Sequence, residues 1–186
     1  YFGAKVVHPS TIQPAIDGSI PVLVKNTNDP DGRYTAIVER SYETGVRAIA
    51  GKRSVCLVNI TSSRMLHAYG FLSSIFSIFA RYRTPVDLIA TSEVSVSVTV
   101  DTFESLDGIL RELRELGAVS VERDVSIVSL VGQDLWKDST FVAEVFESLR
   151  EMPIRMISLG ASDVNLSTVV PDAEFERALQ TLHARF

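Results

Sequence analysis

Residues 86–100 read VDLIATSEVSVSVTV, and their alternation of apolar and polar side chains decides the predicted fold. In the second half, valines at positions 94, 96, 98 and 100 alternate with polar residues. A period of two is typical of a strand with one buried face in an antiparallel sheet. The first half, residues 86–90, is a shorter apolar run, and Thr91, Ser92 and Glu93 predict a tight turn between the two. The stretch therefore predicts a hairpin.

The segments around this hairpin complete a unit of four strands and two helices. Residues 55–61 predict a strand, and residues 71–82 predict a helix because apolar side chains recur at helical spacing. Residues 104–116 predict a second helix, which Gly117 ends, and residues 119–122 predict the last strand. The order βαββαβ is that of a ferredoxin-like unit, so the predicted fold class is α+β.

The same order returns from residue 126, which indicates two copies of one unit. The predicted elements of the second copy are strands at 126–131, 154–159 and 164–170 and helices at 141–149 and 172–182. The chain stops at Phe186 without the last strand. We expect residues 46–50 (VRAIA) to supply it, so that the first unit is inserted into the second. A role for VRAIA as a linker is the alternative.

Composition excludes several classes of function. Hydrophobic residues make up 46% and charged residues 22% of the 186 positions, which is typical of a globular protein. A net charge of −5 argues against a nucleic-acid partner. No apolar run reaches the ~20 residues of a membrane span, and Cys56 is expected to be a buried thiol, so a cytoplasmic protein is predicted.

No spacing of chemically active residues predicts a catalytic site or a metal site. The three histidines are scattered, no nucleophile is paired with a base, and no glycine-rich loop is suited to a phosphate. The sequence therefore predicts neither catalysis nor a bound cofactor in this chain.

Four quoted segments carry a resemblance to a known family. They are YFGAKVVHP at residues 1–9, RMLHAYGFL at residues 64–72, the hairpin at residues 86–101, and MISLGASDVNLS at residues 156–167. In this order they resemble the C-terminal regulatory region of aspartate kinase (aspartokinase), with its tandem ACT domains, in the lysine-sensitive branch.

The resemblance implies how the chain is divided into domains. Residues 1–45 would be a C-terminal remnant of the kinase catalytic domain, and residues 55–124 would be ACT module 1. Residues 46–54 together with 125–186 would be ACT module 2. The chain does not begin with Met, and we expect it to lack an N-terminal portion that holds most of the kinase domain.

The residues themselves suggest an amino-acid site in module 1. Gly70 stands before a predicted helix, where free N–H groups and the helix dipole favour an anion such as a carboxylate. Asp87, on a facing strand, is suited to an ammonium group, so the pair is expected to hold both ends of a zwitterion, or one end together with a lysine side chain. From the residues alone, a plain turn at Gly70 and an exposed carboxylate at Asp87 remain the alternative.

The resemblance implies that this site holds L-lysine. The positions that match the family's effector site, or border it, are Met65, Ala68, Tyr69, Gly70, Phe71, Leu72, Val86, Asp87, Thr91, Ser92 and Glu93. Ala68 and Pro85 depart from serines found in the family, which leaves threonine as an alternative effector.

Two further places are candidates. In module 2, Ser162 and Asn165 lie in a loop with either an interface role or a second effector site. Lys25 and Asn26 follow a predicted strand at residues 20–24 and begin a turn-rich stretch at residues 26–33. The resemblance suggests that they are a nucleotide-binding remnant, and a solvated loop is the alternative.

The function implied by the resemblance is regulatory. The chain would bind L-lysine for feedback inhibition of the ATP-dependent phosphorylation of L-aspartate, in the synthesis of lysine, threonine and methionine. The full enzyme would use ATP and Mg²⁺, whereas this part would be inactive alone. We expect a homodimer through the ACT modules, with strand 94–100 and helix 71–82 as contact candidates. The alternative is a non-catalytic assembly module with a degenerate effector site.

Overall fold

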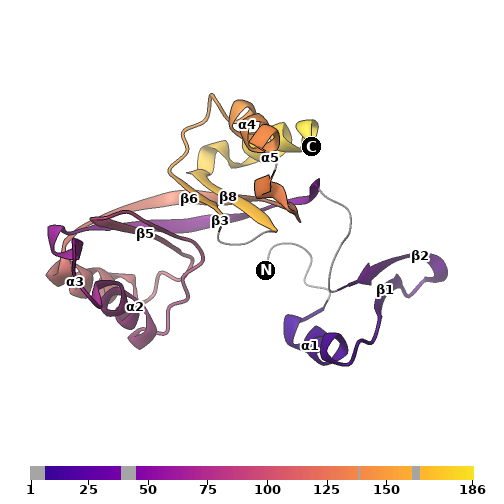
Figure 1. Cartoon of the computed structure of the whole chain (residues 1–186), viewed down its shortest axis with the longest axis horizontal. Helices are drawn as coiled ribbons and strands as arrows, with labels where there is room; N and C mark the ends of the chain where they lie inside the picture. Colours follow the sequence, from indigo (N-terminus) through magenta and orange to yellow (C-terminus); the bar gives the residue numbers. More distant parts are fainter. Residues whose placement is uncertain (1–6, 39–44, 138, 161–163) are drawn as a thin grey trace. The chain divides into compact units, whose positions relative to one another are not determined.

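The computed structural model describes residues 7–38, 45–137, 139–160 and 164–186 (Figure 1). The chain forms two compact units, Tyr1–Thr44 and Gly45–Phe186. The larger unit contains two ferredoxin-like modules of strands and helices, which confirms the predicted α+β fold class.

In its described residues, 7–38, the smaller unit consists of one helix and one hairpin. They are α1 (Pro9–Asp17), β1 (Val22–Asn26) and β2 (Asp29–Ile37). The sequence predicted a turn-rich stretch at residues 26–33, and this prediction is wrong for residues 29–33, which belong to β2. Asp29 pairs with Asn26, and after a register shift residues 34–37 pair with residues 22–25. The turn is short since the Asn26 side-chain oxygen accepts the N–H of Asn28 at 3.0 Å and closes it locally.

The larger unit is built on one antiparallel six-stranded sheet in the order β4-β5-β3-β6-β8-β7. The strands are β3 (Gly45–Thr61), β4 (Ile89–Thr91), β5 (Ser95–Val100), β6 (Ala118–Gln133), β7 (Met156–Leu159) and β8 (Asn165–Pro171). The helices are α2 (Phe71–Arg81), α3 (Leu106–Leu116), α4 (Ser139–Ser148) and α5 (Phe175–Arg185), with 3₁₀ turns at Ser63–Met65, Leu135–Lys137 and Asp172–Glu174.

Strands β3 and β6 each run through both modules. They pair from Gly45 with Gln133 to Thr61 with Ala118. Residues 46–50 thus form a strand of module 2 beside β6, and the predicted insertion of the first module into the second is confirmed. The sequence predicted two separate strands, 46–50 and 55–61, where the structure has β3, and two strands, 119–122 and 126–131, where it has β6. Each of these pairs of predicted strands is one continuous strand in the structure. The register shifts between Val46 and Ala48 and again between residues 52 and 57, and in the second place Ser54 of β3 and Asp124 of β6 have positive φ.

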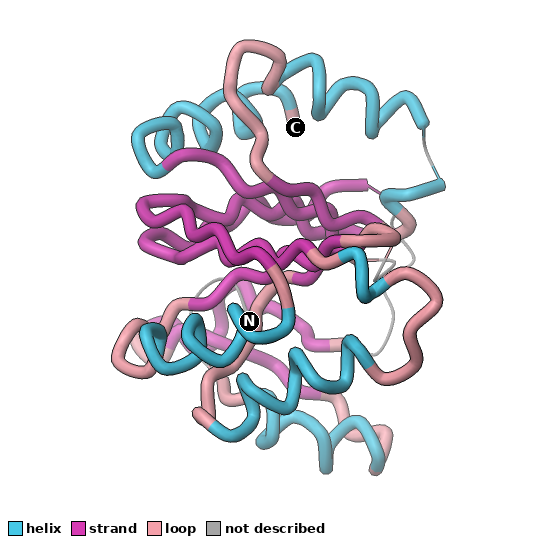
Figure 2. The backbone as a smooth tube through the Cα atoms, turned by 90° about the vertical axis from the view of Figure 1, so that its left-hand side faces the viewer, coloured by secondary structure: helices cyan, strands magenta, loops and turns pink. Residues whose placement is uncertain are grey.

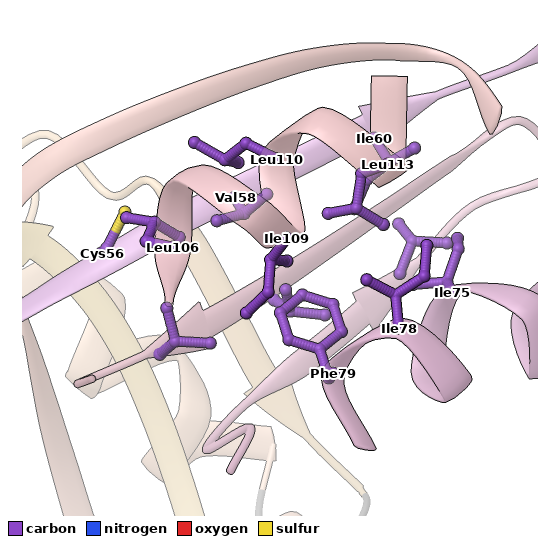
Figure 3. Close-up of a cluster of buried hydrophobic side chains, with 13 residues drawn as sticks. Cys56, Val58, Ile60, Ile75, Ile78, Phe79, Leu106, Ile109, Leu110 and Leu113 are labelled. Atoms are coloured by element: carbon purple, nitrogen blue, oxygen red, sulfur yellow. The ribbon is translucent and has the colours of Figure 1, made fainter. Parts of the chain in front are cut away.

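Each module has its own helix-covered core. In module 1, α2 and α3 pack on β3 and β5, and Figure 3 shows Phe79 and Ile109 among the aliphatic side chains of this cluster. In module 2, α4 and α5 pack on β6 and β8. Figures 1 and 2 show the two helix pairs on opposite sides of the strands. Gly51 permits this packing, since a Cβ there would lie 2.3 Å from the Phe175 ring.

A third buried layer lies on the strand faces that the helices do not cover. Alternation along paired strands places on these faces the buried residues Val55, Leu57, Leu88, Val125, Ile127, Met156 and Val169, which belong to neither core cluster. β4 of module 1 also contacts β7 of module 2. The two uncovered faces therefore turn toward each other, and the modules bury a shared layer.

Removing the module 2 part of β3 tests this arrangement. A chain of residues 45–186 is expected to keep cooperative unfolding in urea, because the larger unit is compact by itself. A chain of residues 55–186 is expected to lose the fixed packing of module 2, since β6 would lack its neighbour beside Val128 and Leu130. Near-ultraviolet circular dichroism and urea titration measure both. Equal cooperativity of the two chains would contradict the shared strand.

Candidate functional site

The loop between β3 and α2 ends in a glycine that opens the start of the helix. Gly70 has φ +79°, in the left-handed region, and nothing lies within 4 Å of the position of a Cβ. α2 begins at Phe71, and within the described part of the chain no side chain caps this end. The first N–H groups of a helix lack partners within it and carry the positive end of its dipole. This end of α2 therefore offers donors to an anion.

A serine turn joins β4 to β5 at the same end of module 1. The N–H of Ser92 donates to the Ser95 carbonyl at 2.8 Å, and Ser92 Oγ accepts the N–H of Ser95 at 3.1 Å. The N–H of Ser62 donates to the Val94 carbonyl at 2.8 Å. Ser62 begins the loop that leads to α2, so this loop starts beside the turn at residues 91–93.

Val86 and Asp87 lie toward the other end of the same strands. The N–H of Asp87 donates to the Thr99 carbonyl at 2.9 Å. Thr99 is four residues beyond Ser95 along β5, a separation of ~13 Å at ~3.3 Å per residue. Lysine reaches at most ~9 Å from its carboxyl carbon to Nζ, six bonds of ~1.5 Å. One lysine therefore does not span the Ser95 and Thr99 ends of β5, and the expectation that Gly70 and Asp87 bind one amino acid together stays a prediction.

Lys52 binds two carboxylates at the Asp87 end. Its Nζ lies 2.9 and 2.7 Å from the two carboxylate oxygens of Asp87 and 2.7 Å from Oδ2 of Asp101. The Asp87 side chain is 3% exposed and that of Lys52 is 20% exposed. A carboxylate this buried requires a cation or several donors beside it. Asp87 does receive an ammonium group, as its chemistry suggested, but in this chain the group belongs to Lys52.

The pKa of Asp101 lies below its ordinary value. The hydrogen bond from Lys52 is the main cause, while partial burial opposes it and the attraction of the Lys52 charge and a hydrogen bond from Thr102 add to it. The ionised form of Asp101 is thus stabilised by folding.

The open edge of module 1 is β4. β5 pairs with β3 on one side and with β4 on the other, so the prediction that strand 94–100 forms the contact with a second chain is wrong. Ile89 on β4, Leu72 on α2 and the fully exposed Tyr69 are exposed apolar side chains of module 1. The edge strand and the start of α2 are thus two parts of module 1 that a second chain can reach.

The remaining predicted residues of module 1 fall into two groups. Met65, Phe71 and Val86 are partly buried and pack against the module 1 core, so they fix the loop and the strand in place. Ala68, Thr91 and Glu93 are exposed.

The candidate residues of module 2 are only partly placed. Asn165 begins β8, is half-buried and pairs with Val131. Position 162 lies outside the described residues. An interface or effector role for this loop stays a prediction.

The candidate residues of the smaller unit bind within their own hairpin. Lys25 Nζ donates to the Pro30 carbonyl at 2.8 Å and lies 5.7 Å from the centre of the Tyr34 ring. Asn26 closes the β1–β2 turn. These contacts account for both side chains, and a nucleotide-binding role stays a prediction.

A polar cavity that the sequence did not predict lies where module 1 faces module 2. It measures about 450 Å³, and its walls include Asn59, Ser97, Glu122 and Arg155. Arg155 binds Glu122 at 2.6 Å and so links the modules across one side of the cavity. Neither Arg155 nor Lys52 was predicted, because each meets its partners only after the two modules come together.

Other classes of site are not found in the part of the chain that the structure covers. Its His, Cys, Asp and Glu side chains form no group suited to a metal ion. Cys56 is buried, as predicted. Among the described helices, none combines the length and the apolar character needed to cross a bilayer.

Comparison with known proteins identifies related sequences. A family model described as the ACT domain matches residues 128–186. Lysine-sensitive aspartokinase 3 of Escherichia coli is 41% identical over 98% of this chain and 43% of its own length. This chain spans less than half the length of the E. coli protein and of aspartokinase 3 of Arabidopsis thaliana.

Solved structures give the same result. E. coli aspartokinase III in complex with lysine and aspartate has a TM-score of 0.83 and 40% identity, over 98% of this chain and 42% of that one. A structure from Porphyromonas gingivalis, described as a C-terminal regulatory domain of aspartate kinase, has a TM-score of 0.65 and 37% identity. It matches 73% of this chain, which in turn covers 93% of it.

Acid titration tests the contacts of Asp101. A carboxylate with a lowered pKa contributes stability above the unfolded value of ~3.9, and the contribution is lost as the pH falls through the folded value. Asp101→Asn is therefore expected to reduce stability at pH 7 and to reduce the loss of stability below pH ~4. Urea midpoints between pH 7 and pH 3 measure this, with Asp107→Asn on exposed α3 surface as the control. An unchanged acid limb in Asp101→Asn would contradict the assignment.

Proposed function

Because this chain belongs to the aspartokinase family and corresponds to its regulatory region, we propose that it binds L-lysine as a feedback inhibitor of aspartate phosphorylation. The reaction, transfer of a phosphoryl group from ATP to the side-chain carboxylate of L-aspartate with Mg²⁺, would take place in the kinase domain. The smaller unit, Tyr1–Thr44, would be the end of that domain. The E. coli relative, named lysine-sensitive, supports lysine as the effector.

The observation that carries this proposal is the carboxylate of Asp87. It is nearly buried and accepts two hydrogen bonds from an alkylammonium group, that of Lys52. The same arrangement suits the ammonium of a free lysine, because charge-assisted bonds to a desolvated carboxylate are strong. The side chain of threonine offers no charge to this position.

The effector site would be composite, with its halves drawn from two chains. Within one chain, the loop before α2 starts at Ser62 beside Val94, whereas Asp87 pairs with Thr99, ~13 Å along β5 from Ser95, which is more than one lysine spans. An isologous pair of chains presents each surface twice, so residue i of one chain meets residue j of the other and the reverse. A second chain can therefore supply the missing half of each site.

Antiparallel pairing of β4 with its copy produces this arrangement. β4 is the open edge of module 1, and it leads from Asp87 toward the turn at Thr91. In an antiparallel pair, the beginning of one strand lies opposite the end of the other. The turn and the start of α2 in one chain would then lie near Asp87 of its partner. Two lysines would bind per pair, and their carboxylates would meet the N–H groups at Gly70.

Regulation would follow from this geometry. A ligand held by two chains binds the paired arrangement more tightly than any other, so it shifts the population toward that arrangement. If the kinase domains are less active in it, lysine inhibits them without contacting the catalytic residues.

Calorimetric titration of the 186-residue chain tests the effector. L-lysine is expected to bind and L-threonine is not. Asp87→Asn should weaken lysine binding about tenfold to a hundredfold, since a hydrogen bond to a charged group contributes ~1.5–3 kcal/mol. Asp107→Asn, on exposed surface of α3, should leave it unchanged. Absence of heat with either amino acid would reject lysine sensing and favour a module that serves assembly alone.

A charge on the β4 edge tests the composite site. Ile89→Lys would place two ammonium groups near each other across the pair, and a charged edge opposes strand pairing. We expect sedimentation to show dissociation and the lysine affinity to fall. Ile157→Lys, the matching exposed isoleucine on β7 at the edge of module 2, is the control. Undiminished lysine binding by Ile89→Lys would show that one chain holds the whole site.

A further inference from the structure

Lys52 occupies the position that the proposed effector ammonium would take. Its Nζ contacts both oxygens of Asp87, at 2.7 and 2.9 Å, and Oδ2 of Asp101 at 2.7 Å. The three residues come from distant parts of the chain. Lys52 lies in the module 2 part of β3, whereas Asp87 and Asp101 flank the β4–β5 hairpin of module 1.

Exposure differs among the three groups in a way that favours exchange. Asp87 is 3% exposed, and the Lys52 ammonium is one of the groups that cover its carboxylate. Asp101 is 34% exposed and opens to solvent. When the Lys52 ammonium leaves Asp87, it can therefore stay paired with Asp101. The Lys52–Asp101 ion pair is better hydrated than the Lys52–Asp87 pair, and ion pairs in contact with water contribute little to stability.

We propose that Lys52 is an internal substitute for the effector side chain, which holds Asp87 in the unliganded protein and gives it up when the ammonium of L-lysine arrives. The proposal rests on the proposed function, since it concerns the same carboxylate. The four methylenes and ammonium of Lys52 are the side chain of the effector itself. The space beside Asp87 thus already has the shape and charge that lysine requires.

Exchange of one ammonium for another explains selectivity. Because the Asp87 side chain is 3% exposed and both of its carboxylate oxygens contact the Lys52 ammonium, a ligand that displaces Lys52 must bring a positive charge to the same place. L-lysine does so and L-threonine does not. Lys52 therefore acts as a specificity-determining residue that no pattern in the sequence identified.

The position of Lys52 also couples the site to the joint between the modules, which is the part of β3, residues 52–57, where the strand passes from module 2 to module 1. Lys52 is the last regularly paired residue before the register shift of β3, and Ser54 two residues later has φ +57°. Release of Lys52 from Asp87 would remove the ion pair that ties this joint to module 1. Ligand binding would thereby act on the strand that the two modules share.

Chemical rescue of Lys52→Ala tests the proposal. The substitution removes Cγ, Cδ, Cε and Nζ, which together make n-propylammonium. We expect n-propylammonium chloride to raise the melting temperature of Lys52→Ala but not that of the parent chain. Sodium chloride at the same concentration and n-propanol should have no such effect. Lys137→Ala, which removes a surface ion pair with Asp134, is the control and should not respond.

Lysine affinity provides the second readout. Lys52→Ala should bind L-lysine about tenfold more tightly than the parent chain, because the internal competitor is gone. Asp101→Asn, which deprives displaced Lys52 of its other partner, should bind L-lysine more weakly. This variant keeps the proposal testable if Lys52→Ala does not fold.

The outcomes separate this proposal from the proposed function. If Lys52→Ala binds lysine as weakly as Asp87→Asn, or if Asp101→Asn leaves the affinity unchanged, Lys52 only supports the fold and the proposal is overturned. If neither the parent chain nor any variant binds lysine but n-propylammonium still rescues Lys52→Ala, the space beside Asp87 does accept an alkylammonium group, and lysine sensing is rejected.

Discussion

The pairing of β3 with β6 is the constraint on which the larger unit depends. The two strands pair over 17 and 16 residues, and each gives one half to module 1 and the other half to module 2. Neither module can complete its sheet without a strand that is covalently part of the other. The register shifts near residues 52–57 let this ribbon pass from one module to the next without breaking its ladder. Loss of either core would thus remove support from both.

Charged residues cluster where the ribbon passes between modules. Lys52 binds Asp87 and Asp101 of module 1, while the next residue, Arg53, binds Asp172 of module 2 and stacks over the ring of Phe175 at 5.0 Å. A joint built from ion pairs differs from one built from packed side chains. Its partners can be exchanged for a ligand of like charge without opening a cavity. The joint is therefore a suitable place for an effector to act.

The residues predicted as one site lie in two parts of module 1. The loop that leads to Gly70 starts beside the turn at Ser92, and Asp87 lies toward the other end of β5. Local patterns identify turns, helix starts and exposed carboxylates, but they contain no information on which end of a strand each element reaches in space. The distance along β5 between these two places exceeds the length of a lysine, and β4 is an edge strand of the described sheet.

The sequence alone determined the fold class, the repeat, the insertion of module 1 into module 2 and most strands and helices. The alternation at Val96, Val98 and Val100 and the helical spacing in α2 and α3 are local patterns, and they predicted these elements correctly because the apolar side chains are buried in the core. All three valines are fully buried. Residues 46–50 were predictable because module 2 lacked one strand. Only the tertiary structure decided the continuity of β3 and β6, the internal position of β5, and the pairing of Lys52 with Asp87. The physical reason is that these depend on contacts between residues far apart in the chain, and a side chain's partner is set by the approach of two modules rather than by its neighbours in sequence.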